Sequence, residues 1–165
     1  MKKLAYTIDI NIKRGIGFAF KRAWLKNIIK TVLSAEKINK PVAVSLLITD
    51  DRHIQEMNRL YRGIDAPTDV LTFALSEKPA DAPDIVFPEE QSGITSLGEI
   101  IISYPRIIEQ AAEHGVSVAE EVALIVVHGM LHLLGYNHED AAGARKMRRR
   151  EKAIMALIKQ EQGYE

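Results

Sequence analysis

A helix without a polar side most constrains how this chain can fold. Ser117 and Glu120 form a capping-box pattern, which predicts a helix that runs from there to Leu134. The centre of this helix, residues 122–127, is apolar on all sides because it contains only valine, alanine, leucine and isoleucine. A helix that is hydrophobic all round must lie in the core, so the other elements have to surround it. This run is far shorter than the roughly 20 residues that cross a membrane, and we expect no membrane association.

Length and composition place this helix inside one ordinary domain. The chain has 165 residues, of which 47% are hydrophobic and 27% charged. These values are typical of a globular protein and exclude a disordered, collagen-like or coiled-coil chain. The chain has no cysteine, which excludes a disulfide framework and any thiolate metal site. No apolar signal core follows the first residues, so we expect one cytoplasmic domain over residues 1–165.

The order of the apolar patterns predicts an α+β fold with helices packed on four strands. The strands are expected at residues 4–12, 42–48, 70–75 and 97–104. The helices are expected at residues 18–33, 50–63, 105–114 and 117–134, and from about residue 139 onward. The segment from Ser76 to Ser96 contains three prolines and predicts a long loop, and loops of that length are usually functional or mobile.

The formal net charge of zero hides an uneven distribution. Residues 1–40 carry a net charge of +8, residues 41–138 carry −10, and residues 139–165 carry +2. In the last helix, one side carries Met147, Ile154 and Ile158. The opposite side carries a basic stripe, which consists of Arg145, Arg148, Arg149 and Lys152. Such a stripe can bind the phosphate backbone of RNA. The same charges are equally well explained as the solvent-exposed face of a helix with no binding role.

Three histidines at and beyond the end of the buried helix carry the strongest chemical signal. His128 and His132 are four residues apart, so one helical turn places both imidazoles on the same face. Gly135 can end the helix and turn the chain back, so that His138 supplies a third nitrogen from outside it. Three imidazoles that converge in this way predict one bound metal ion with a fourth position left for water or substrate.

Two other interpretations of the histidines have to be weighed. Glu139 or Asp140 could fill the fourth position and close a structural site, but a chain of this size needs no metal to fold, which favours an open site. The histidine spacing also coincides with that of metzincin proteases, which place a glutamate base after the first histidine. Gly129 occupies that position here, so peptide hydrolysis lacks its base. His53 and His114 have no partner at ligand spacing and are interpreted as surface residues.

Phosphodiester chemistry suits three neutral histidines better, because they leave the full divalent charge on the metal to polarise a phosphoryl oxygen. A phosphodiester transition state also needs a fixed cation, and the planar fork of arginine binds two oxygens. Arg62 is the candidate for this role, in the stretch from Asn58 to Phe73. On spacing alone, Arg62 is just a charged residue at the end of a helix.

Taken together, these motifs resemble the YbeY family of zinc-dependent single-strand endoribonucleases. The resemblance rests on the histidine segment 128–138, on Asn58 to Phe73, and on Leu97-Gly98-Glu99-Ile100, and it covers about residues 42–140 in the right order. It implies that one Zn²⁺ ion is bound by His128, His132 and His138, and that His128 and Arg62 are catalytic. One departure is Asn137, where the family usually has aspartate before the last histidine; we expect it to affect reaction rate more than metal binding.

The same resemblance implies a fold and a biological role. The fold would be a mixed four-stranded sheet flanked by about five helices, with the metal site at the end of the buried central helix. The role would be 3′-end maturation of small-subunit ribosomal RNA and ribosome quality control. The partners would be single-stranded RNA, the small ribosomal subunit and ribosome-associated proteins. The alternative is a non-catalytic ribosome-assembly factor whose zinc site is structural.

Overall fold

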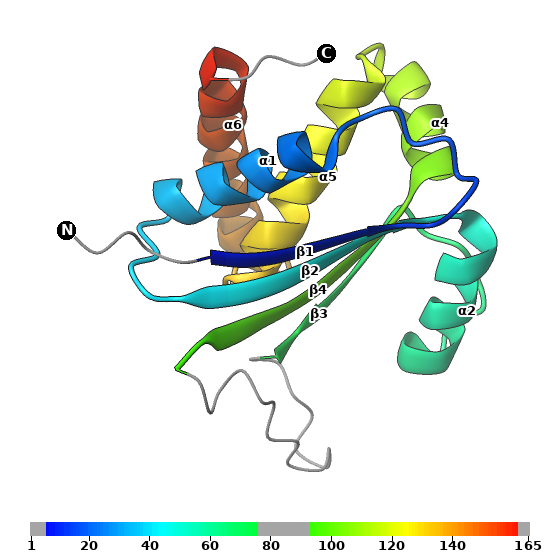
Figure 1. The fold of residues 1–165 in the computed structure, drawn as a ribbon, viewed down its shortest axis with the longest axis horizontal. Coiled ribbons are helices and arrows are strands. Elements are labelled where there is room, and N and C mark those ends of the chain that lie inside the picture. Colours follow the sequence, from blue (N-terminus) through cyan, green and yellow to red (C-terminus); the bar gives the residue numbers. More distant parts are fainter. Residues whose placement is uncertain (1–5, 76–92, 162–165) are drawn as a thin grey trace.

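The computed structural model describes residues 6–75 and 93–161, and within these residues four strands form one sheet with five helices around it (Figure 1). The strands are β1 (Tyr6–Ile12), β2 (Val42–Thr49), β3 (Val70–Ala74) and β4 (Thr95–Ser103). The helices are α1 (Arg22–Ala35), α2 (Asp51–Arg62), α4 (Tyr104–His114), α5 (Val118–Leu133) and α6 (Ala141–Glu161). The predicted α+β fold is confirmed.

The sheet is mixed, with the strand order β1-β2-β4-β3. The β1–β2 and β2–β4 pairs are parallel, and β3 is an antiparallel edge strand beside β4. Leu46 in the middle of β2 pairs with Ile10 of β1 and Ile100 of β4. Apolar residues on both sides of these central strands fit a sheet that helices cover on two faces.

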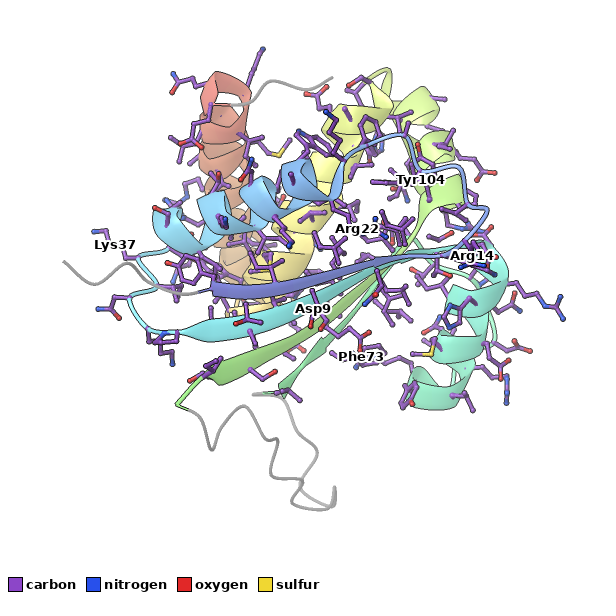
Figure 2. All side chains as sticks on the ribbon, in the orientation of Figure 1. Asp9, Arg14, Arg22, Lys37, Phe73 and Tyr104 are labelled. Atoms are coloured by element: carbon purple, nitrogen blue, oxygen red, sulfur yellow. The ribbon has the colours of Figure 1, made fainter. Side chains whose placement is uncertain are left out.

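The helices divide between the two faces of the sheet. The larger core joins residues such as Leu46 and Ile100 to buried side chains of α1, α4, α5 and α6. The smaller core joins Leu71 of β3 and Ile101 of β4 to Ile54 of α2 on the opposite face. Figure 1 shows this division, with α2 below the sheet and α1, α5 and α6 above it. Figure 2 shows the same arrangement at side-chain level, with Tyr104 above the sheet and Phe73 below it.

Helix α5 is the central helix, as its apolar sequence predicted. Eleven of its sixteen residues are buried. The Ser117 side chain caps it by accepting a hydrogen bond of 3.1 Å from the backbone N–H of Glu120. Among the described residues, no single helix is long and apolar enough to cross a membrane; α4 and α5 meet that criterion only as a pair, across a bend of 113°.

A glycine allows the edge strand to pair with β4. The register between β2 and β4 shifts between Ala43 and Val44, which leaves a bulge on β4 beside Gly98. Gly98 has φ +133°, and a Cβ atom there would lie 2.1 Å from the carbonyl oxygen of Phe73 on β3. Only glycine lets the two backbones come this close.

Some element boundaries differ from the predictions for local reasons. Helix α1 begins at Arg22 instead of Phe18, because Lys21 is extended and the ring of Phe18 packs edge-on against Tyr104. Helix α6 begins at Ala141, since the Asp140 carboxylate accepts a hydrogen bond from the third residue of the helix. The predicted loop from residue 76 to residue 96 lies largely outside the described residues, and β4 already begins at Thr95.

Candidate metal centre

The three predicted histidines come together at the C-terminal end of α5. Each of His128, His132 and His138 offers a ring nitrogen, and these nitrogens lie within 4.8 Å of one another. His128 and His132 are half-buried, whereas His138 is exposed. Three imidazoles from a helix and the turn after it therefore converge at the surface, where a substrate can reach them.

The end of α5 explains how His138 reaches the other two. The N–H of Gly135 donates to the carbonyl of His132, and the N–H of Tyr136 donates to the carbonyl of Leu131, both over 3.0 Å. Gly135 has φ +102°, a backbone conformation that favours glycine. This helix end reverses the chain within three residues and places His138 beside the last turn, as the sequence predicted.

A carboxylate from α6 orients the first histidine. Glu151 accepts a hydrogen bond from Nδ1 of His128, and the Glu151 side chain is only 15% exposed. With the proton on Nδ1, the lone pair of Nε2 faces Nε2 of His132 at 3.1 Å. Two ligands of a tetrahedral zinc ion, with Zn–N distances of about 2.0–2.1 Å, lie about 3.3 Å apart. The spacing of the two histidine nitrogens therefore fits a tetrahedral divalent metal ion such as zinc.

The surroundings of His132 keep its imidazole in the form that binds a metal. Burial lowers its pKa below the usual value, and the neighbouring imidazoles of His128 and His138 lower it further. Metal ions bind the neutral imidazole, so a lowered pKa reduces the competition from protons.

No protein side chain fills the fourth ligand position of the site among the described residues. Among residues 6–75 and 93–161, no aspartate or glutamate joins the three histidines as a ligand group. Asp140, one candidate for closing the site, uses its carboxylate to accept a hydrogen bond from the backbone N–H of Gly143. The other candidate, Glu139, is exposed. The geometry thus resembles a catalytic site with three protein ligands more than a closed structural one.

Packing explains why no glutamate base follows the first histidine. Gly129 is buried, and a Cβ atom at this position would lie 3.0 Å from a methyl group of Ile100 on β4. Helix α5 can approach the sheet here only because Gly129 has no side chain. There is consequently no room for the glutamate that a metzincin protease has at this position.

The structure does not place Arg62 in contact with the histidines. Arg62 is exposed at the end of α2, where its Nη2 donates to the carbonyl oxygen of Thr72 on the edge strand over 2.6 Å. Its guanidinium also lies 5.2 Å from the centre of the Phe73 ring. Among the described residues, no hydrogen bond or ion pair joins Arg62 to the metal-binding group, which lies at the end of a helix on the other face of the sheet.

The basic stripe lies on the exposed side of α6, as its spacing predicted. Met147, Ile154 and Ile158 are buried against the main core. The four members of the stripe, Arg145, Arg148, Arg149 and Lys152, are all exposed. Glu151 comes from the same helix, so α6 carries both the stripe and the carboxylate that orients His128.

Three residues acquire roles that the sequence interpretation missed. Glu151 is the acidic residue on the apolar side of α6, between Met147 and Ile154. An acidic residue on an otherwise apolar helix face was the sequence signal that could have indicated its partner His128. Two histidines interpreted as surface residues have partners: His53 contacts the Thr49 hydroxyl over 2.9 Å and is half-buried, and His114 is exposed but bonded to the buried Glu121. No pattern in the sequence pointed to these last two contacts.

Glu99 lies on the face of the sheet that α2 covers. It lines a cavity of about 250 Å³ together with Met57, Tyr61 and Phe73. Burial raises the pKa of the Glu99 carboxyl above its usual value, and the charge of His53 opposes that effect. The Leu97–Ile100 motif therefore contributes a half-buried carboxyl to this cavity.

Comparisons with known proteins show the family of this chain. The family described as "Endoribonuclease YbeY" matches residues 10–159. The chain belongs to the YbeY family. A protein from Moorella thermoacetica named "Endoribonuclease YbeY" is 49% identical over 134 residues, which cover 81% of this chain and 84% of that protein. A protein of the same name from a Roseiflexus species is 42% identical over 159 residues, which cover 92% of each chain.

A solved structure has a similar fold. The chain is similar to the solution structure of TM1509 from Thermotoga maritima, with a TM-score of 0.60 and 27% sequence identity. The likeness covers 94% of this chain and 91% of TM1509. The YbeY match at residues 10–159 includes all three histidines, Arg62 and Glu151.

Proposed function

We propose that this chain is a zinc-dependent endoribonuclease that cuts single-stranded RNA in the cytoplasm. Within that role, we propose that it matures the 3′ end of small-subunit ribosomal RNA and takes part in ribosome quality control with ribosome-associated proteins. The relatives that carry the name endoribonuclease support the RNA substrate. The observation that carries the proposal is the open group of three histidines, whose nitrogens converge within 4.8 Å.

Each residue of the group would have a distinct task. His128, His132 and His138 would hold the zinc ion, which when bound supplies a divalent charge to polarise a phosphoryl oxygen. Glu151 would hold the His128 ring so that Nε2 faces the ion. Arg62 donates one N–H to Thr72, and its other guanidinium donors would bind the phosphate of an RNA strand that crosses the edge of the sheet.

The basic stripe on α6 would follow the RNA backbone. Its four exposed cations lie on the helix that carries Glu151, which links them to the His128 end of the site. Contacts of this kind bind phosphates without reading bases, and they release counterions. We therefore expect RNA affinity to fall steeply as salt increases.

The first experiment is cleavage of an end-labelled single-stranded RNA by protein of measured zinc content. We expect cleavage by the natural protein and none by His128→Ala, which also serves as the control for a contaminating nuclease. Chemical analysis of the product ends would separate attack by water from attack by the RNA 2′-hydroxyl. Equal cleavage by both proteins would contradict the proposal. Bound zinc without cleavage by either protein would instead indicate an assembly factor with a structural metal.

The role of Arg62 is tested by Arg62→Glu, which we expect to bind zinc normally and to lose cleavage. The Thr72 hydrogen bond is lost as well, so stability has to be measured in parallel. Arg62→Met is the matched variant, because it removes the hydrogen bond and the charge without adding a negative one. Normal cleavage by Arg62→Glu would show that Arg62 binds no RNA phosphate on which cleavage depends.

The role of the stripe is tested by the salt dependence of binding to single-stranded RNA. Each phosphate contact contributes about −0.7 to the slope of log K against log salt concentration. Arg148→Gln combined with Arg149→Gln should reduce the slope by about 1.4. Arg52→Gln, an exposed arginine of α2 on the other face of the sheet, is the control and should leave the slope unchanged. An unchanged slope in the double variant would exclude the stripe.

The ribosomal substrate is tested with precursor small subunits that carry an unprocessed 3′ end. We expect the natural protein to shorten that end and His128→Ala to leave it intact. Cleavage of free RNA without processing of the precursor would support the nuclease but contradict the proposed role in maturation.

A further inference from the structure

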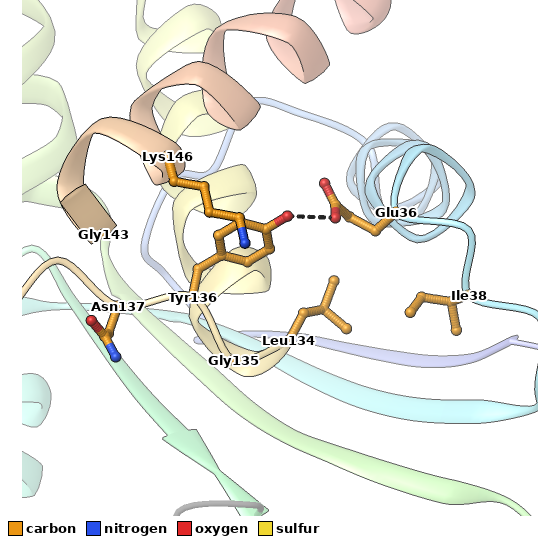
Figure 3. A pocket seen from close by; sticks show the side chains of 8 residues that line it. All are labelled: Glu36, Ile38, Leu134, Gly135, Tyr136, Asn137, Gly143 and Lys146. Carbon is orange, nitrogen blue, oxygen red and sulfur yellow. Dashed lines mark hydrogen bonds between the residues drawn. The ribbon is translucent and has the colours of Figure 1, made fainter.

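A cleft of about 450 Å³ lies between the turn that follows α5 and the end of α1 (Figure 3). Its apolar wall consists of Ile38, Leu134 and the ring of Tyr136. Lys146 and Asn137 line it as well, and Asn137 directly precedes the metal-binding His138. The cleft is therefore next to the metal centre, and it combines an apolar wall with polar groups.

The acidic residue of this cleft, Glu36, is paired with two hydrogen-bond donors. Glu36 accepts a hydrogen bond of 2.8 Å from the Tyr136 hydroxyl on one carboxylate oxygen. Its other oxygen accepts from Nε of Arg150 over 2.7 Å. These two partners fix the Tyr136 ring against the end of α1, and they leave little negative charge to repel an anion.

Two other polar groups of the cleft, the Lys146 ammonium and the Asn137 amide, have no hydrogen-bond or carboxylate partner among the described residues. The Lys146 ammonium lies 5.6 Å from the centre of the Tyr136 ring, and among the described residues it has no carboxylate partner. A Cβ atom at Gly143 would lie 3.3 Å from the Asn137 side-chain oxygen, and Figure 3 shows the amide nitrogen directed away from Gly143. Within the described part of the chain, the Asn137 amide makes no hydrogen bond.

We propose that this cleft binds one nucleotide of the RNA next to the phosphate that is cut, an inference that rests on the proposed function. The base lies against Ile38, Leu134 and the Tyr136 ring, and Lys146 binds the phosphate of that nucleotide. The Asn137 amide hydrogen-bonds the base or the sugar, since an amide both donates and accepts. An apolar wall with one cation and one amide matches the chemistry of a nucleotide.

The residue at position 137 sets the electrostatics of this cleft. An aspartate there would place a negative charge between the histidines and Lys146. It would repel the phosphate and could donate no hydrogen bond. The asparagine of this chain therefore favours a nucleotide in the cleft.

The test uses adenosine 5′-monophosphate, which has no internucleotide bond to cleave, with zinc-loaded protein. Backbone amide shifts in NMR report where it binds. We expect saturable shifts at Gly135, Asn137 and Gly143, smaller shifts with adenosine at the same amides, and weaker binding of ribose 5-phosphate. Equal affinities for adenosine 5′-monophosphate and ribose 5-phosphate, with shifts confined to the histidines, would show a phosphate on the metal alone and overturn the proposal.

Variants identify the contributing side chains. Lys146→Met and Asn137→Asp should each weaken binding of adenosine 5′-monophosphate about fivefold, the effect of one exposed charged contact. Lys159→Met removes the same charge from the far end of α6 and should change the affinity less than twofold. If both cleft variants keep their affinity and the natural protein cleaves RNA, the proposed nucleotide site is refuted. The proposed nuclease function is then unaffected. A natural protein that cleaves no RNA would refute the proposed function itself.

Discussion

The hydrogen bond between His128 and Glu151 joins the candidate metal centre to α6. A ligand histidine that donates its second N–H to a carboxylate keeps one tautomer and one ring orientation. Glu151 is mostly buried among the apolar side chains with which α6 contacts the core, so it cannot easily move away. The position of His128 Nε2 therefore depends on the packing of α6 as well as on α5.

Replacing this carboxylate should weaken metal binding. Glu151→Ala is expected to reduce zinc affinity about 10- to 100-fold, because His128 loses its orienting partner. Glu151→Gln keeps an acceptor oxygen and should lose less zinc affinity than Glu151→Ala. Zinc affinity measured by competition with a chelator checks this, with Glu109→Gln, an exposed carboxylate of α4, as the control. Equal affinity of Glu151→Ala and the natural protein would contradict the orienting role.

A single missing side chain sets how closely α5 approaches the sheet. A Cβ atom at Gly129 would lie within 3.0–3.3 Å of three side-chain atoms of Ile100. Gly129→Ala gains about 1 kcal/mol in helix propensity but should cost about 1–3 kcal/mol in overpacking. We expect a net loss of stability in the natural background and a net gain in the Ile100→Ala background. Urea unfolding of the four proteins checks this, and an effect of the same sign in both backgrounds would contradict it.

At the scale of elements, α4 and α5 are joined by an ion pair at their connection. Nδ1 of His114, at the end of α4, lies 3.1 Å from the carboxylate of Glu121 in the first turns of α5. The Glu121 side chain is only 3% exposed. The hydrogen bond to Glu121 and its negative charge raise the pKa of His114 above its usual value, against a smaller effect of desolvation.

This raised pKa predicts how stability depends on pH. A histidine whose pKa is higher in the folded state than in the unfolded state stabilises the fold fully below the unfolded value of about 6.5. The contribution is lost as the pH rises through the folded value. We therefore expect the stability difference between the natural protein and His114→Gln to shrink from pH 5.5 to pH 8.5, at constant zinc loading. Thermal unfolding across this range checks it, and a constant difference would contradict it.

At the scale of the whole molecule, the core lies apart from the candidate metal centre. The buried side chains of α1, α5 and α6 pack on the sheet, whereas the histidines are half-buried or exposed. A ligand that binds only the folded state adds stability by mass action, about 2.7 kcal/mol at a hundredfold excess over Kd. Removal of the metal should therefore lower stability without unfolding the chain.

Chelation tests this independence. We expect EDTA to lower the Tm by about 5–10 °C while one cooperative transition and the far-UV circular dichroism spectrum persist. Readdition of zinc should restore the original Tm. An apo protein that is unfolded at 25 °C would contradict the prediction and indicate a structural metal site.

Local geometry explains what could be predicted from the sequence. Helical and strand periods depend only on the backbone within a few residues, so the apolar patterns located β2, α2 and α5 to within a residue or two. The same reasoning placed His128 and His132 on one helical face and the turn at Gly135. These relations involve residues at most ten positions apart along the chain, and they hold whatever the rest of the chain does.

Tertiary structure decided the relations between distant segments. Nothing local set the strand order β1-β2-β4-β3, the contact between Gly129 and Ile100, or the hydrogen bond from Arg62 to the edge strand. The orientation of His128 by Glu151 and the bond between Tyr136 and Glu36 join residues 23 and 100 positions apart. Such contacts depend on how helices pack against the sheet, because small shifts in packing move side chains past one another. The sequence by itself thus determined the three candidate metal ligands, and only the packed structure determined what surrounds them.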